Sequence, residues 1–201
     1  MRWLLATTVL MATPIFAANN PPARCIGEIC ISPPNKESKE LVRQYGKGSI
    51  RKDADDPTLR IHCYYDARQQ LWFELELEAS EQQPNKLELT GIFVTQSPMC
   101  PVSATPQNSL PDFVSEHGVR IGATEAEVVK KMGKPQRIDD VVAVEKKMSH
   151  KIGDDSRYAS KFGTRRLVYE RTNEISPQDL RFNFYGLTDG RVTSIWFADR
   201  E

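Results

Sequence analysis

Two stretches of the chain match one another position by position, and this internal repeat limits the possible fold more than any other feature of the sequence. Residues 40–47 and residues 127–134 each place apolar residues at helical spacing and then a glycine, Gly46 or Gly133. A glycine directly after such a run is typical of the end of a helix. Self-similarity of this kind indicates a structural unit that has been duplicated.

Alternating apolar residues follow each predicted helix. Residues 71–77 and 180–185 alternate with period two, which is typical of half-buried antiparallel strands. A second matched pair of strands is predicted at residues 89–94 and 192–197, and a shorter strand precedes each set. We therefore expect an α+β fold of two tandem units, in which a helix or helix pair packs on a three- to four-stranded antiparallel sheet. The predicted organisation is a signal peptide over residues 1–17, a first repeat over 18–100, a linker over 101–111 and a second repeat over 112–201.

The first residues have the layout of a secretory signal peptide. Arg2 precedes a short apolar run, and Pro14 and the small residues Ala17 and Ala18 follow it. The run is shorter than the ~20 residues that cross a bilayer, so we expect no transmembrane segment. Proline and arginine shortly before Cys25 depart from the cysteine-ending box of a lipoprotein, so no lipid anchor is expected. The predicted location is the periplasm, or the medium after secretion, once the signal peptide has been cleaved.

All four cysteines lie in the first half of the chain. An even number of cysteines in an exported protein indicates disulfides, because the compartment is oxidising. Three pairings are possible for Cys25, Cys30, Cys63 and Cys100. We favour Cys25–Cys30, which is local across Gly27, together with Cys63–Cys100. Their irregular spacing, without a histidine pair nearby, argues against a metal site.

The mature chain carries almost no net charge. The full sequence has 27 basic and 27 acidic residues, and removal of residues 1–17 takes away Arg2 and no acid, so the net charge falls to about −1. Such a chain has no general attraction for nucleic acid or anionic lipid, and neither is an expected partner.

The sequence contains no recognisable catalytic set. His62, His117 and His150 are its only residues of the type that titrates near neutral pH. His62 adjoins Cys63 in a predicted strand, where their side chains would point to opposite faces. No nucleophile elbow, phosphate-binding loop or zinc-protease motif is present. We therefore expect no enzymatic activity, no cofactor and no bound metal.

Strand alternation assigns side chains to a candidate binding face. If the leucines of residues 71–77 face the helix, the residues between them face away, and the same reasoning applies to the matched strands. Exposed aromatic side chains beside charged ones are typical of protein interfaces. The predicted partner-binding surface consists of Trp72, Glu74, Glu76, Phe93, Arg181, Tyr185 and Trp196.

A long insertion rich in charged residues separates the second predicted helix from its strands, at residues 138–164. Long segments without obvious structure are usually either functional or disordered. The sequence leaves both interpretations open.

Residues 118–135 resemble the helix and Gly-x-Pro signature of SmpA/OmlA (BamE-like) domains, with Gly133 and Pro135 as the signature residues. Tyr169 and residues 180–184 and 189–195 resemble the strands of the same domain. The likeness covers residues 112–201, with a fainter copy over 26–97, and the tandem is similar to the fold of the β-lactamase inhibitory protein. The resemblance implies this fold and a protein-binding role.

We therefore expect an exported periplasmic protein-binding module, such as an inhibitor or immunity-type protein, with another exported or envelope protein as its partner. The alternative is a scaffold protein associated with envelope or outer-membrane assembly, which the family resemblance alone would imply. The doubled unit and the missing lipoprotein box weigh against that alternative.

The mature chain should begin at Ala18 and carry no lipid, because the signal peptide is cleaved after Ala17. The intact mass of protein purified from the envelope of cells that express it measures both features. A mass that includes residues 1–17, or a lipid on Cys25, would contradict this prediction.

Overall fold

The computed structural model describes residues 25–31, 38–52, 56–80, 83–100, 104–141, 163–172 and 180–200. The predicted signal peptide, the predicted start of the mature chain at Ala18 and most of the insertion at 138–164 lie outside these residues. Within them, no helix is long and apolar enough to cross a membrane.

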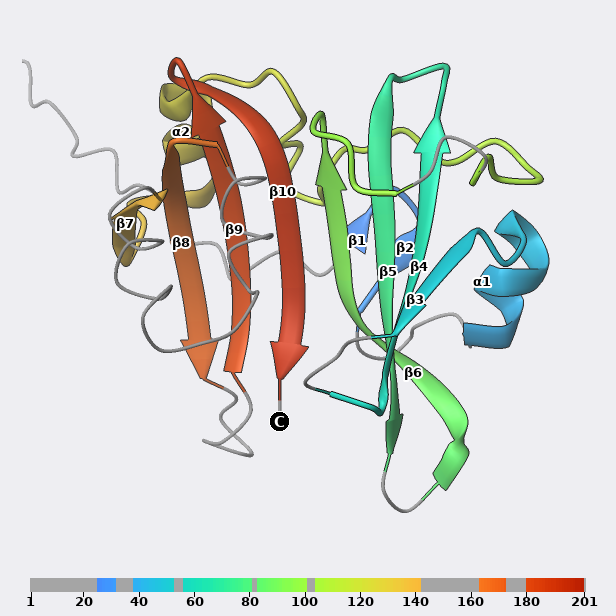
Figure 1. Ribbon diagram of the computed structural model, residues 1–201. Helices are drawn as coiled ribbons and strands as arrows, with labels where there is room; N and C mark the ends of the chain where they lie inside the picture. Colours follow the sequence, from blue (N-terminus) through green and yellow to red (C-terminus); the bar gives the residue numbers. More distant parts are fainter. Residues whose placement is uncertain are drawn as a thin grey trace, which may run out of the picture.

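A single antiparallel sheet of eight strands dominates the described part of the chain (Figure 1). Its strands follow the order β3-β4-β5-β6-β10-β9-β8-β7. A separate hairpin pairs β1 (Cys25–Ile26) with β2 (Ile29–Cys30). The helices are α1 (Ser38–Tyr45) and α2 (Glu125–Met132). The strands of the large sheet are β3 (Ser49–Lys52), β4 (Leu59–Asp66), β5 (Leu71–Ser80), β6 (Gln83–Thr95), β7 (Arg137–Asp140), β8 (Arg165–Thr172), β9 (Leu180–Thr188) and β10 (Arg191–Arg200).

The expected fold class is therefore wrong. The sequence predicted an α+β chain with a helix packed on a separate small sheet in each unit, whereas the described residues are mostly strand and share one sheet. The strands run beyond the matched blocks, to thirteen residues in β6, while each described helix has only eight. The two sets of strands join because β6 pairs with β10. A local sequence pattern does not predict a pairing between segments so far apart in the chain.

One face of the sheet packs against both helices and contains the main hydrophobic core, and we call it the helix face. Leu41 and Tyr45 of α1 and Val128 and Met132 of α2 are buried in this core. The short helices are stabilised by this burial, since helices of such length are marginal in isolation. The strands contribute Tyr64, Phe73, Leu75, Leu77, Ile92, Val94, Leu167, Tyr169, Tyr185, Leu187, Ile195 and Phe197 to the same core.

The two helices end in the same way. The Gly46 N–H donates to Val42 O at 2.8 Å, and the Gly133 N–H donates to Val129 O at 2.9 Å. Both glycines have positive φ, of 82° and 84°, a conformation that costs glycine little. A capping box is present at the start of α2, with the Thr124 side chain accepting from the Glu127 N–H.

A tyrosine from the sheet binds each helix end. The Tyr64 hydroxyl donates to Gly46 O at 2.7 Å, and the Tyr169 hydroxyl donates to Gly133 O at 3.0 Å. Burial raises the pKa of Tyr64 and raises the pKa of Tyr169 to about 12, so both hydroxyls keep the proton that they donate. The same contact thus fixes a helix to the first long strand of each half.

The register between β6 and β10 gives the sheet a local twofold axis. Residues 92–94 are the sequence counterparts of residues 195–197, and the two segments pair in opposite directions. Such a self-complementary pairing is what an isologous contact between two similar units produces. The paired residues are Val94 with Ile195, Phe93 with Trp196, and Ile92 with Phe197. The axis therefore passes through the Phe93–Trp196 pair.

Both disulfides have the predicted pairing, Cys25–Cys30 and Cys63–Cys100. The first closes the β1–β2 hairpin, whose Ile26 and Ile29 are fully buried in the helix-face core. The hairpin also contacts the start of the second half, because the Gly27 N–H donates to Val114 O at 2.9 Å. The second ties β4 to the segment that follows β6. The first disulfide therefore closes a short hairpin outside the large sheet, and the second anchors a segment that follows one of its strands.

The Cys63–Cys100 disulfide should contribute more stability than Cys25–Cys30. The sequence separations are 37 and 5 residues, and the chain-entropy estimate gives roughly 4 and roughly 2 kcal/mol for loops of these sizes. Urea unfolding of the two paired Cys→Ala variants, compared with the oxidised protein, measures the difference. A larger loss for the Cys25/Cys30 variant would mean that hairpin packing, and not loop closure, sets the contribution.

Candidate functional site

The sheet has a second face, opposite the helix face, and we call it the outer face. In Figure 1, α2 and the β1–β2 hairpin lie behind the sheet, so the outer face is toward the reader. Because paired residues of neighbouring strands share a face, the register identifies one row of residues that crosses all eight strands. From β3 to β7 this central row is Ser49, Cys63, Glu74, Phe93, Trp196, Phe184, Val168 and Arg137.

An aromatic cluster occupies the middle of the outer face. The Trp196 ring centroid lies 6.5 Å from that of Phe93, 5.0 Å from that of Phe182 and 5.2 Å from that of Phe184. Such contacts add stability beyond the area they bury. Val141, Val168 and Ala198 complete this second hydrophobic cluster, and Met99 packs against it.

Five of the predicted partner-binding residues do lie together on the outer face. Trp72, Glu74 and Glu76 occupy alternate positions of β5, and Phe93 and Trp196 pair across the twofold axis. The Trp72 ring packs against Tyr65 of β4 at a centroid distance of 4.8 Å. Arg181 is part of β9, where it pairs with Asp199 and Arg171, and its side chain lies outside the described residues.

Tyr185 is on the other face, so its predicted orientation is wrong. Its side chain is fully buried in the helix-face core, with its ring 5.7 Å from Tyr169 and 6.0 Å from Phe197. Its hydroxyl donates to Met132 Sδ at 3.6 Å. Alternation misled here because the apolar Phe182 and Phe184 of β9 lie on the outer face, whereas Asn183 is buried on the helix face. A strand that is buried on both sides does not reveal which face meets the helices.

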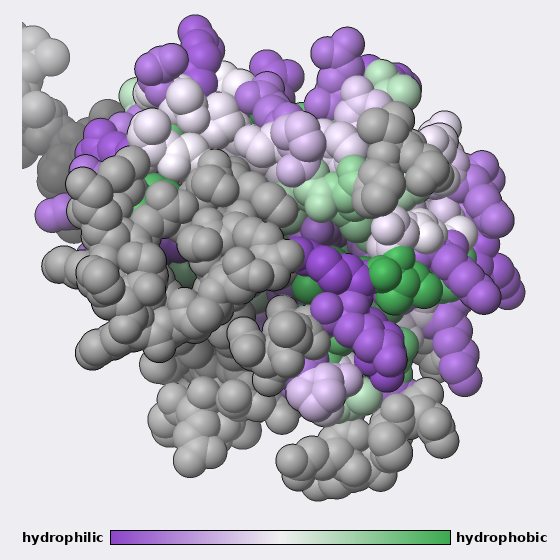
Figure 2. All heavy atoms as spheres, in the orientation of Figure 1, coloured by the Kyte–Doolittle hydropathy of each residue, from purple (hydrophilic) through white to green (hydrophobic). Residues whose placement is uncertain are grey.

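The predicted exposure of these side chains is also wrong. Trp72 is 6% exposed and Glu74 and Phe93 are each 1% exposed, whereas Trp196 is only half-buried. Among the described residues, Met99 and Val141 pack on this face. Figure 2 shows hydrophobic side chains bordered by hydrophilic ones over the first half of the sheet, in the same view as Figure 1. Trp196 is therefore the aromatic residue of the predicted set that is nearest to being accessible.

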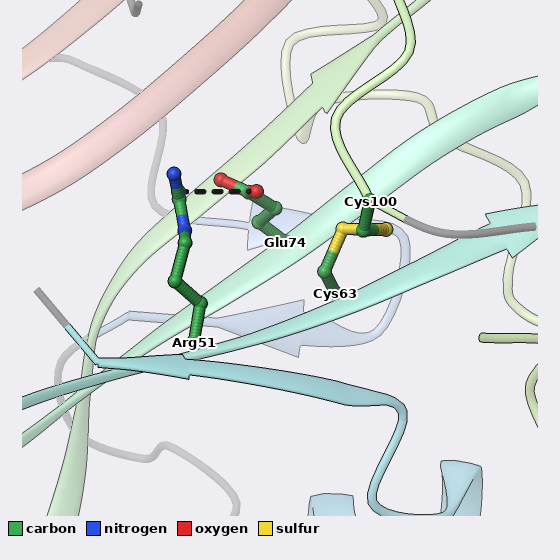
Figure 3. Close-up of a disulfide and its surroundings, with 4 residues drawn as sticks. All are labelled: Arg51, Cys63, Glu74 and Cys100. Carbon is green, nitrogen blue, oxygen red and sulfur yellow. Dashed lines mark hydrogen bonds and ion pairs between the residues drawn. A yellow bond between two sulfur atoms is a disulfide. The ribbon is translucent and has the colours of Figure 1, made fainter.

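A buried ion pair lies beside the Cys63–Cys100 disulfide (Figure 3). Arg51, on the edge strand β3, points toward Glu74, and its Nη2 lies 3.4 Å from Glu74 Oε1. A buried carboxylate is costly unless it is paired, and Arg51 supplies an opposite charge. Glu76, two residues along β5, extends over Gly91 of β6, where an added Cβ would lie 2.1 Å from Glu76 Oε2. Glycine at position 91 thus leaves room for this carboxylate.

A second ion cluster lies at the opposite edge of the outer face. Asp139 of β7 accepts hydrogen bonds from Arg166 Nη2 at 2.6 Å and from Arg137 Nε at 2.7 Å. Burial by itself would raise the pKa of Asp139, but these hydrogen bonds and charges outweigh burial and lower its pKa. The Arg166 guanidinium also lies over the Phe184 ring, 4.4 Å from its centroid. The arginine therefore joins the ion cluster to the aromatic cluster.

The two halves of the sheet are more alike on the helix face than on the outer face, although the helix face also matches Phe73 with Asn183 and His62 with Leu167. When Tyr64 of the first half is aligned with Tyr169 of the second half, the strand pairings align the core residue Leu77 with Leu187 and Ile92 with Ile195. All four residues are buried and apolar. The same alignment on the outer face matches Cys63 with Val168, Glu74 with Phe184, Glu76 with Gly186 and Arg51 with Asp139. The common fold therefore does not require the outer-face side chains of either half.

Several residues of the outer face were not predicted as part of a site. Phe182 and Phe184 were assigned to the core side of β9, and Val168 and Arg166 were not singled out at all. The sequence contains no clear signal for them, because Phe182 and Phe184 alternate with Asn183 and Tyr185 as in a strand buried on one face.

The described histidines do not form a catalytic arrangement. His62 Nδ1 lies 2.9 Å from Lys47 O, and burial lowers the pKa of His62. Its neighbour Cys63 is in a disulfide. The Nε2 atom of His117 lies 3.6 Å from Oε1 of Glu116. His150 lies outside the described residues. Among those that are described, no three His, Cys, Asp or Glu side chains gather in a way that could hold a metal ion.

Comparisons with protein-family models, with curated proteins and with solved structures found no match to this chain. The resemblance to SmpA/OmlA (BamE-like) domains thus stays a prediction from the sequence.

Replacement of Asp139 by Asn should lower the free energy of unfolding at neutral pH by about 1.5–3 kcal/mol, because it removes a charged acceptor from two arginines. A carboxyl whose pKa is lowered by folding stabilises the protein above its ordinary pKa of about 3.9, and this contribution is lost as the pH falls through the lowered pKa. Urea unfolding of Asp139→Asn and the parent protein from pH 7 to pH 3 tests this.

The difference in the free energy of unfolding between Asp139→Asn and the parent protein should shrink toward acid pH. Asp140→Asn, on the exposed neighbouring side chain, is the matched control and should lower stability less than Asp139→Asn does. A difference for Asp139→Asn that does not depend on pH would contradict the assigned role of its charge.

Proposed function

We propose that this chain is an exported protein-binding module, such as an inhibitor or immunity-type protein, and that its partner is another exported or envelope protein. The observation that carries the proposal is the contrast between the two halves of the sheet. Most matched positions of their helix faces are apolar in both halves, while matched positions of the outer face hold Glu74 and Phe184, or Arg51 and Asp139. Side chains that the common fold does not require are free to serve recognition.

The make-up of the outer face supports a protein partner. Aromatic residues and arginine are enriched in the energetically dominant parts of protein interfaces, and here Trp196, Phe184 and Arg166 adjoin one another. Trp196 is half-buried and sits on the local twofold axis, so contact with a partner would start there. Nothing in the described face suggests affinity for nucleic acid, and we assign no enzymatic activity, cofactor or metal to it.

The two disulfides support the proposed location. Disulfides persist in oxidising compartments such as the periplasm and the extracellular medium. Together with the signal-peptide pattern of residues 1–17, they favour a chain that acts outside the cytoplasm.

A scaffold role in envelope or outer-membrane assembly is the second candidate. The observation that favours it is the likeness of residues 112–201 to SmpA/OmlA (BamE-like) domains, which includes Gly133 and Pro135. The two candidates differ in the partner they require, a single exported target for an inhibitor and subunits of an assembly machine for a scaffold.

Affinity capture of the mature, oxidised protein from its own envelope, followed by mass spectrometry, tests the proposal. A secreted toxin or hydrolase as the partner would support inhibition, and assembly-machine subunits would support the scaffold. Trp196→Ala and Trp72→Ala should each weaken the complex by about 2 kcal/mol or more, which is roughly 30-fold in Kd.

Val114→Ala, at an exposed residue beside the β1–β2 hairpin, is the control and should leave binding unchanged. Because Trp72 is buried, thermal unfolding of each variant must accompany the binding measurement. If the double substitution of Trp72 and Trp196 folds and leaves every captured partner bound, the outer face is not the binding surface.

A further inference from the structure

The strand β7 is the last described strand of the sheet, and one of its edges faces no other described strand. Among the described strands it pairs only with β8. The Val141 N–H donates to Thr164 O, directly opposite in register, and in an antiparallel pair every second residue bonds to the neighbouring strand. Asp139 therefore faces β8, and the backbone N–H and C=O of Ile138 point away from β8. An open edge of this kind is a template for another strand.

The side chains of β7 are complementary to a second copy of themselves. In an antiparallel pairing centred on Ile138, Arg137 of one copy lies opposite Asp139 of the other, and the reverse pair forms by symmetry. Ile138 would lie opposite its own counterpart, and its side chain is 47% exposed. On the same side of the strand, exposed Gln136 would lie opposite Asp140. Opposite charges directly across strands stabilise a pairing.

We propose that two copies of this chain associate through β7, antiparallel to each other, about a twofold axis at Ile138. The centred pairing makes Ile138 a hydrogen-bonded pair, because its backbone groups already point outward. Arg137 and Asp139 then form non-hydrogen-bonded pairs, in which side chains across the strands are closer. The result is a continuous sheet shared by two chains, with an isologous contact.

The other edge of the sheet lacks this complementarity. The edge strand β3 carries Ile50 at the position equivalent to Ile138, and its side chain is 50% exposed. A pairing of β3 centred on Ile50 would place Ser49 opposite Arg51, and the next charge, Lys52, has the same sign as Arg51. The two edges thus match in shape and exposure but differ in charge pattern, which makes β3 an internal control.

The dimer is expected to be weak. The contact involves residues 136–140 of each copy, which falls well short of the roughly 1,200 Å² buried by stable complexes. The inference does not depend on the proposed function, since β7 lies at the edge of the sheet and Trp196 at its centre.

Sedimentation equilibrium of the full mature, oxidised chain over a wide concentration range tests the inference. The parent protein should show a reversible monomer–dimer equilibrium that weakens as salt is added, because the Arg137 member of each cross-strand pair is exposed and salt screens its charge. Ile138→Lys places two ammonium groups opposite one another and should raise the dimer Kd at least tenfold. Ile50→Lys, the matched variant on β3, should leave the dimer Kd within twofold of the parent value.

A variant that is expected to strengthen the dimer separates a specific effect from misfolding, because a misfolded variant would lose association and not gain it. Gln136→Lys places an ammonium opposite the carboxylate of Asp140 in the second copy and should lower the dimer Kd severalfold. A parent protein that stays monomeric at every concentration overturns the proposal. So does an equal effect of Ile138→Lys and Ile50→Lys, or a Gln136→Lys variant that folds and associates no better than the parent.

Discussion

The pairing of β6 with β10 is the contact on which the rest of the structure depends. It joins two sets of four strands into one sheet, and its register places Phe93 opposite Trp196 on a local twofold axis. Without this pairing each half would expose a long strand edge in the middle of an apolar sheet, which is a strong liability for aggregation. The pairing also makes both faces continuous across the halves, so the helix-face core and the outer-face cluster each span the axis.

The two faces of the sheet differ in how far the side chains of the two halves resemble each other. On the helix face, both halves use a tyrosine that binds the carbonyl of a helix-ending glycine, and both fill the core with apolar residues. On the outer face, the first half holds the Arg51–Glu74 pair and a disulfide, whereas the second holds Phe184 and the Asp139–Arg166 pair. Close packing tolerates few changes in a core, while a face that no common helix covers is less constrained.

The chain between the two halves is tied to the first half of the sheet. The Cys63–Cys100 disulfide holds its beginning on β4, and the Tyr65 N–H donates to Ala104 O at 3.0 Å. Further along, Phe113 packs on Phe73 with a ring distance of 5.0 Å, and the β1–β2 hairpin contacts Val114. These contacts hold the described part of the predicted linker, from residue 104 onward, against the first half of the sheet.

The sequence by itself determined the local features of this protein. Helix ends at Gly46 and Gly133, the capping box at Thr124, the alternating strands and the Cys25–Cys30 disulfide were predictable, because each depends on residues close in the chain. Once that local pair was chosen, Cys63–Cys100 was the remaining one. The matched blocks also identified Phe93 and Trp196 as counterparts that face away from the helices, and both lie on the outer face. Only the tertiary structure decided that the strands share one sheet, that Tyr185 faces the helices and that Trp72 and Glu74 are buried. Alternation separates the two sides of a strand, but the choice of the side that meets a helix, or of the edge that meets another strand, is made by segments far away in the sequence.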